Sequence, residues 1–155
     1  MKRQIRLYTA VAIMLAAGSV LLAQGNPFVG TWTLNVASSK FNPGPPPQSQ
    51  SRTWDAKGMV MVNGVNAAGK PFSYGYSVNG DGKPSPTMGA MPNTADMIST
   101  KKVDANTYEA AFMKAGKQVE TTTFTVSNGG KTLTIHAKGT TPTGEFENIQ
   151  VFDKM

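Results

Sequence analysis

The chain has 155 residues, a single histidine, no cysteine and a formal net charge of +6 at pH 7. A chain of this length holds one small domain. The lack of cysteine excludes disulfides, thiolate metal sites, a thiol nucleophile and a lipid-anchored lipoprotein. Because His136 and nine carboxylates offer little material for metal ligation or acid–base chemistry, we expect no metal site, no cofactor and no catalytic residues.

The N-terminal segment, residues 1–23, is predicted to be a signal peptide. Its uncharged apolar run ends at Ala23 and follows three basic residues, Lys2, Arg3 and Arg6. A basic start, an apolar run and a small residue before a polar turn are typical of secretory signals. We therefore expect cleavage of this signal helix after Ala23 and a periplasmic or secreted domain over residues 24–155. An uncleaved membrane anchor is the alternative.

The positive charge does not indicate nucleic-acid binding. Cleavage would remove three basic residues, and the lysines that remain are scattered at turns, where they improve solubility. Arg52 is the only arginine of the expected mature domain. A nucleic-acid groove needs clustered basic residues beside exposed aromatics, so we expect no nucleic-acid partner.

From Asn26 onward, turn signals rich in glycine, asparagine and aspartate recur about every twelve residues. Between them lie runs rich in threonine, valine and aromatic residues that alternate with period two, such as residues 72–78 and 132–137. No helical period continues over two turns. The mature domain is therefore predicted to be all-β, with short strands in series.

Two segments rich in proline interrupt this pattern. Residues 42–48 are predicted to be an extended connector, because successive prolines cannot donate to a β-ladder. Residues 83–93 are predicted to be a loop at an edge or at the mouth of the fold. The methionines of this second segment either pack locally or form an adaptable binding surface.

A series of short strands joined by tight turns must cover or pair its two edges. Closing the sheet achieves this, whereas a sandwich needs longer crossover connections. We therefore predict an up-and-down antiparallel β-barrel of about 8–10 strands. A barrel of this size leaves space at its axis for one small ligand.

Gly30 and Trp32 form a Gly-x-Trp motif at the start of the first expected strand. This motif resembles the opening of lipocalins and fatty-acid-binding proteins, which belong to the calycin superfamily. A longer resemblance, to small exported bacterial proteins described only as lipocalin-like, rests on residues 30–35, 39–47, 104–107, 130–134 and 148–154. The resemblance implies that Trp32 is a structural plug that closes one end of the barrel. Lipocalins place an arginine across this tryptophan. No arginine follows Arg52 in this chain, so Lys138, Lys154 or no residue takes that position.

The nature of the ligand follows from a difference within this resemblance. Fatty-acid-binding proteins hold the ligand carboxylate on an Arg-x-Tyr pair in the last strand, where this chain has Gln150, Val151 and Phe152. Their helical lid also has no counterpart, because residues 37–49 are too few and too rich in proline for two helices. We therefore expect a lipophilic ligand that is uncharged or weakly polar.

Strand alternation selects the side chains that share one inward face. The predicted ligand-binding residues are Tyr74, Tyr76, Tyr108, Phe112, Asn148, Gln150 and Phe152. Their rings would line an apolar pocket, and their hydroxyl and amide groups would orient the ligand. The alternative is that these side chains fill the barrel as a core.

His136 is expected to point outward, because its neighbours Leu133, Ile135 and Ala137 occupy the apolar face.

Taken together, these features predict an exported, monomeric binding protein for a small lipophilic molecule. An envelope protein with a filled barrel that binds a protein partner is the second hypothesis. The third is an enzyme that uses His136 with Glu145 or Glu147.

Overall fold

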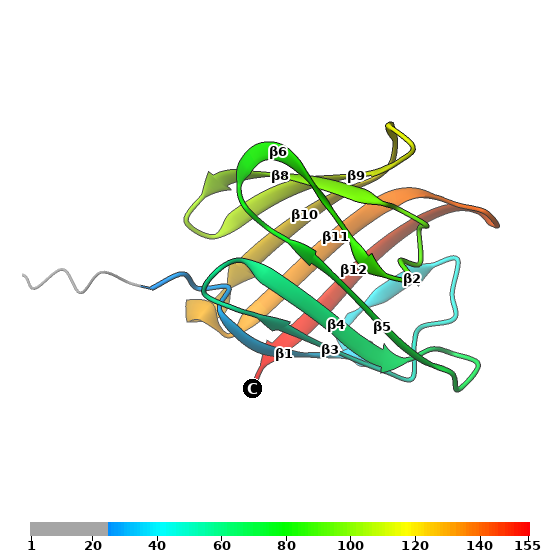
Figure 1. Cartoon of the computed structure of the whole chain (residues 1–155). Coiled ribbons are helices and arrows are strands. Elements are labelled where there is room, and N and C mark those ends of the chain that lie inside the picture. Colours follow the sequence, from blue (N-terminus) through cyan, green and yellow to red (C-terminus); the bar gives the residue numbers. More distant parts are fainter. Residues whose placement is uncertain (1–24) are drawn as a thin grey trace, which may run out of the picture.

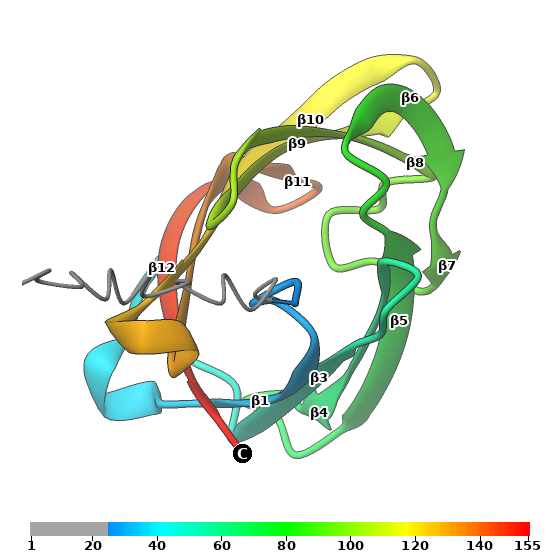
Figure 2. The same ribbon diagram turned by 90° about the vertical axis from the view of Figure 1, so that its left-hand side faces the viewer.

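The computed structural model describes residues 25–155, so the predicted signal peptide lies outside the described part. The described residues form one antiparallel sheet that curls into a nearly closed barrel (Figures 1 and 2). The prediction of an all-β antiparallel barrel is confirmed. None of the described helices is long and apolar enough to span a membrane.

The elements follow the turn signals of the sequence. In chain order they are β1 (Gly30–Leu34), the short 3₁₀ helix η1 (Val36–Ser38), β2 (Lys40–Asn42), β3 (Ser49–Trp54), β4 (Met59–Val65), β5 (Pro71–Ser77), β6 (Asp81–Pro86), β7 (Met88–Gly89), β8 (Met97–Asp104), β9 (Thr107–Lys114), β10 (Lys117–Ser127), the 3₁₀ helix η2 (Asn128–Gly130), β11 (Thr132–Thr141) and β12 (Gly144–Lys154).

Twelve strands form the sheet, not eight to ten, because two stretches of the ring are interrupted. β1 and β2 pair with successive parts of β12 and are separated by η1. β6 and β7 are separated only by Thr87, and they pair with β8 and β5 respectively. The segment from β6 to β7 therefore connects the two ends of the sheet, and β1 pairs with β12 on the other side of the ring.

Part of the predicted loop at residues 83–93 is strand. Pro84 and Pro86 lie in β6, opposite Ser99 and Met97 of β8. Proline lacks a backbone N–H, but an edge strand with one unpaired side tolerates it. The loop proper is shorter and covers residues 90–96.

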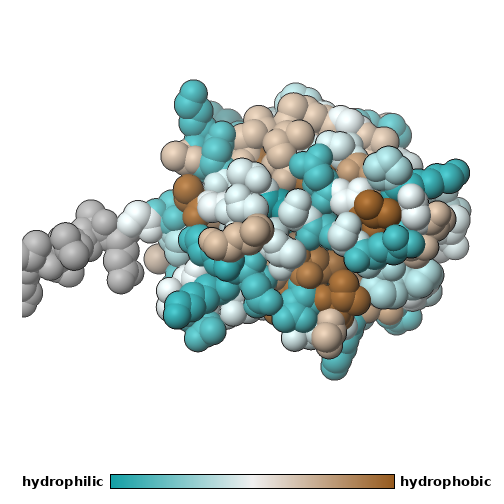
Figure 3. Space-filling model, turned by 90° about the horizontal axis from the view of Figure 1, so that it is seen from below, coloured by the Kyte–Doolittle hydropathy of each residue, from teal (hydrophilic) through white to brown (hydrophobic). Residues whose placement is uncertain are grey.

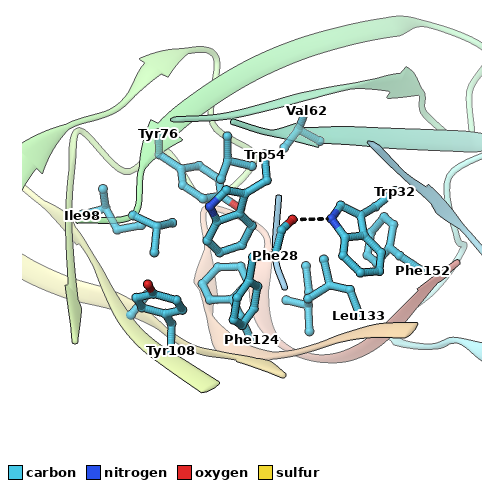
Figure 4. Close-up of a cluster of buried hydrophobic side chains, with 14 of the residues drawn as sticks. Phe28, Trp32, Trp54, Val62, Tyr76, Ile98, Tyr108, Phe124, Leu133 and Phe152 are labelled. Carbon is cyan, nitrogen blue, oxygen red and sulfur yellow. Dashed lines mark hydrogen bonds between the residues drawn. The ribbon is translucent and has the colours of Figure 1, made fainter. Parts of the chain in front are cut away.

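One end of the barrel is filled by a plug of aromatic and aliphatic side chains (Figure 4). Its largest fully buried members are Phe28, Trp32, Trp54, Phe124, Leu133 and Phe152. The indole N–H of Trp32 donates to the carbonyl oxygen of Phe28 at 2.8 Å. The Trp32 ring is therefore fully buried, and its indole N–H is hydrogen-bonded inside the barrel.

Lys154 is the candidate residue that lies across Trp32. Its Nζ lies 5.0 Å from the centre of the Trp32 ring and donates to the carbonyl oxygen of Pro27 at 3.2 Å. Gly30 allows this approach, because a Cβ at that position would lie 2.8 Å from Cε of Lys154. The outer face in Figure 3 is mixed, with small apolar groups surrounded by hydrophilic residues.

Candidate functional site: a cavity opposite the plug

The half of the barrel away from the plug contains a cavity of about 340 Å³. Its walls come from β3, β5 and β9 to β12, and its mouth is bordered by the turn between β11 and β12 and by Pro43 and Gly44. The loop at residues 90–96 folds into the ring (Figure 2), where Met91 and Asn93 are buried. The cavity is therefore enclosed on its sides and open toward the loops.

Five of the seven predicted ligand-binding residues line this cavity. They are Tyr74, Tyr76, Phe112, Asn148 and Gln150. The first three contribute rings, and the last two contribute amides from the final strand. Strand alternation therefore placed these five side chains on the inward face, as the structure does.

The other two predicted residues, Tyr108 and Phe152, lie in the plug and do not line the cavity. The Tyr108 ring packs 5.1 Å from Phe28 and 5.9 Å from Trp54, measured between ring centres. Phe152 is fully buried beneath Arg52. Both side chains face inward as predicted, but they lie nearer the plug. Phe152 is two residues from Gln150, about 7 Å along the strand, and Tyr108 is four residues from Phe112, about 13 Å.

Arg52 is a cavity residue that sequence reasoning missed. It is 3% exposed, and its Nη1 donates to the Tyr76 hydroxyl oxygen at 2.8 Å. Its guanidinium carbon lies 4.6 Å from the centre of the Phe152 ring, and its Nε has no hydrogen-bond partner among the described residues. The available signal was its inward phase on β3, where Gln50, Arg52 and Trp54 are all buried.

Glu120 on β10 is the second charged residue of the cavity that the sequence analysis missed. One of its carboxylate oxygens accepts a hydrogen bond from the Thr122 hydroxyl, and the other accepts from Nδ2 of Asn93 at 2.6 Å. Burial raises the pKa of Glu120, while these two hydrogen bonds and the charge of Arg52 oppose that rise. Asn93 also fixes its own loop, because its side-chain oxygen accepts from the backbone N–H of Ala95.

The two tyrosines next to Arg52 remain neutral. Burial raises the pKa of Tyr74 and the pKa of Tyr76, and the charge of Arg52 only partly opposes this effect. Their hydroxyl groups therefore act as hydrogen-bond donors and acceptors toward the cavity and carry no charge.

His136 lies outside this site. Its Nε2 is 2.9 Å from a carboxylate oxygen of Glu147, and both side chains are about half exposed. The hydrogen bond to His136 is the main cause that lowers the pKa of Glu147, and Lys138 adds to it. Residues 25–155 contain no group of three acidic or histidine side chains that would hold a metal ion.

No family model matches the chain, and no curated protein matches it either. Among solved structures, that of zebrafish ileal bile acid-binding protein complexed with cholic acid matches with a TM-score of 0.50 and 12% sequence identity. The match covers 83% of this chain and 99% of that chain. At this identity the likeness shows the fold alone, a barrel like that of the bile acid-binding protein.

Proposed function

We propose that this protein is an exported carrier that binds a small, uncharged lipophilic molecule in the barrel cavity and performs no chemistry on it. The observation that carries the proposal is the cavity opposite the plug, where aromatic walls surround a few polar groups. A volume of about 340 Å³ is at the lower end of the range for small-molecule sites. The zebrafish neighbour was solved in complex with cholic acid, a small lipophilic molecule, which is in keeping with this proposal.

The position of the polar groups supports binding over a purely structural barrel. In a filled barrel, apolar side chains would pack at these inward positions at lower cost than Arg52, Glu120 and Gln150. Each of these polar groups must recover its lost hydration through hydrogen bonds. An occupant with a lipophilic body and a polar end would supply the missing contacts. The outward position of His136, next to Glu147, supports binding without catalysis.

The first experiment identifies the natural occupant. The protein is purified from its own source, and native mass spectrometry then compares its mass before and after organic extraction. We expect a mass loss that corresponds to one small molecule, and N-terminal sequencing of the same sample is expected to begin at Gln24 if the signal is cleaved. Repeated extraction without any released molecule would favour the filled-barrel hypothesis.

The second experiment tests whether the cavity is the binding site. Ala137 is 4% exposed and lines the cavity, so Ala137→Phe fills part of it. We expect this variant to bind a neutral lipophilic dye at least tenfold more weakly than the unmodified protein, provided that circular dichroism shows the same β-structure. Ala68→Phe, in an exposed turn, is the matched control and should leave binding unchanged. Equal dye binding by the two variants would contradict the proposed site.

A further inference from the structure

The inner wall of the cavity carries a buried cation and a partly buried carboxylate that do not pair with each other. Arg52 and Glu120 both line it, and we call these two residues the split charge pair. Ion pairs within 4.0 Å among the described residues do not include Arg52 with Glu120. Buried charges normally form direct pairs because their desolvation is costly. A separated pair inside a cavity therefore requires a physical explanation.

Neutral groups hold each member of the split charge pair in position. Tyr76 accepts from Arg52 at 2.8 Å, while the guanidinium rests on the Phe152 ring. Glu120 accepts from Thr122 through one oxygen and from Asn93 through the other. The inner wall thus presents a donor on one side and an acceptor on the other, while Glu145, the remaining charged residue of the lining, is exposed to solvent.

We propose that the split charge pair recognises a primary carboxamide, an uncharged head group that carries both a hydrogen-bond acceptor and N–H donors. The inference rests on the proposed function and specifies the polar end of its ligand. The carbonyl oxygen of the amide accepts from Arg52, and one amide N–H donates to Glu120. Such a ligand connects the two charges without adding a third.

A second unsatisfied group in the same wall supports this choice. The side-chain oxygen of Gln150 is buried and has no hydrogen-bond partner among the described residues, and Gln150 lines the cavity. A rotation of this amide would bring its oxygen to the second N–H of the ligand. With that rotation the cavity would offer one donor for the carbonyl and two acceptors for the NH₂ group, which is the complement of a primary carboxamide.

Other head groups fit the split charge pair less well. A carboxylate places a second negative charge in the cavity of Glu120, and an ammonium group places a second positive charge in the cavity of Arg52. An ester or ketone provides an acceptor for Arg52 but leaves Glu120 without a donor. The primary amide satisfies both residues and adds no charge to the cavity.

Three probes with the same alkyl chain test the head group directly. Dodecanamide, dodecanoate and methyl dodecanoate are each titrated against the full-length protein loaded with the neutral dye N-phenyl-1-naphthylamine at pH 7.5. We expect dodecanamide to displace the dye at a concentration at least tenfold lower than either other probe requires. Dodecanoate binding as tightly as dodecanamide, or three equal affinities, would overturn the inference while the proposed carrier function stands.

The variant Glu120→Gln gives a readout that a purely structural role would not produce. Removal of the carboxylate charge leaves Arg52 as an uncompensated cation, so the preference should move from dodecanamide toward dodecanoate by at least tenfold. Glu147→Gln makes the same change on the outer surface and should leave the ratio of affinities unaltered. An unchanged ratio in folded Glu120→Gln protein would also overturn the inference.

The failure of the proposed function has a different signature. In that case neither the dye nor any of the three probes binds the unmodified protein, and extraction releases no native molecule. If Glu120→Gln does not fold, the comparison of the three probes on the unmodified protein still decides the question. A preference for dodecanamide there supports the inference, and its absence overturns it.

Discussion

Replacement of Tyr76 by phenylalanine tests whether Arg52 is held as a buried cation. The hydrogen bond from Arg52 to Tyr76 is 2.8 Å long, and both side chains are 3% exposed. Hydrogen bonds that involve a charged group contribute about 1.5–3 kcal/mol, and the loss of an acceptor leaves a buried donor unsatisfied. Nε of Arg52 already lacks a partner, so the variant would leave a second guanidinium N–H unsatisfied. We therefore expect Tyr76→Phe to lower the free energy of unfolding by about 2–3 kcal/mol.

A double-mutant cycle separates this effect from a loss of packing. Arg52→Met removes the cation but keeps most of the side-chain volume. In that background Tyr76→Phe should cost less than about 0.5 kcal/mol, because no stranded donor remains. Urea unfolding at pH 7 measures all four proteins, with the m-value as a check that the unfolded state is unchanged.

The control and the refuting result follow from the same cycle. Tyr108→Phe removes a hydroxyl from a tyrosine that packs in the plug through its ring, and we expect it to cost clearly less than Tyr76→Phe. An equal cost of Tyr76→Phe with and without Arg52 would refute the reasoning. The two side chains would then be energetically independent, and Arg52 would not be available as an anchored donor in the cavity.

Three further predictions concern the plug and the titrating groups. Trp32→Ala should lower the free energy of unfolding by about 3–5 kcal/mol, since the ring is fully buried, and dye affinity of the folded fraction should stay within about twofold because the cavity lies at the other end. Burial raises the pKa of Glu120, so the free energy of unfolding should fall as pH rises from the unfolded pKa of this group through its folded pKa. Glu120→Gln should lack this part of the pH dependence. Urea titrations between about pH 4 and 8 measure it. A slope retained in that variant would contradict the assignment. The hydrogen bond to His136 lowers the pKa of Glu147, so the stability from this contact should be present above the unfolded pKa of Glu147 and lost as pH falls through its folded pKa. Because the pair is exposed and screened by solvent, His136→Ala should leave the urea midpoint at neutral pH almost unchanged.

The barrel was predictable because its determinants are local. Turn residues at regular intervals and alternating strand residues define hairpins between neighbours in the chain, and the ring follows when every edge needs a partner. The strand count was not predictable from the same signals. The prolines at positions 84 and 86 indicated a loop, but in the barrel they lie in β6, the last strand of the continuously paired order, where a missing N–H is tolerated.

The alternation of inward and outward residues could not predict how deep a side chain lies along the barrel axis. A period of two determines which face a residue takes, and it was correct for Phe112 and Gln150 as well as for Tyr108 and Phe152. Depth depends on the register between strands, which pairs Tyr108 with Phe124 and Phe112 with Glu120. Tyr108 therefore belongs to the plug and Phe112 to the cavity, although both lie on β9 and face the same way.

A gradient along three strands explains why the two charged cavity residues were missed and how they could have been found. Toward the plug, the inward residues of these strands run Gln50, Arg52 and Trp54; Glu120, Thr122 and Phe124; and Asn148, Gln150 and Phe152. A uniformly filled barrel gives no reason for polar side chains to gather at the same end of three inward rows, because each one loses hydration there. Three rows that become polar in the same direction therefore indicate that this end of the barrel meets a polar group or water. Single residues such as Arg52 carry little information in the sequence, whereas the shared direction of the three rows indicates both the apolar plug and the polar cavity.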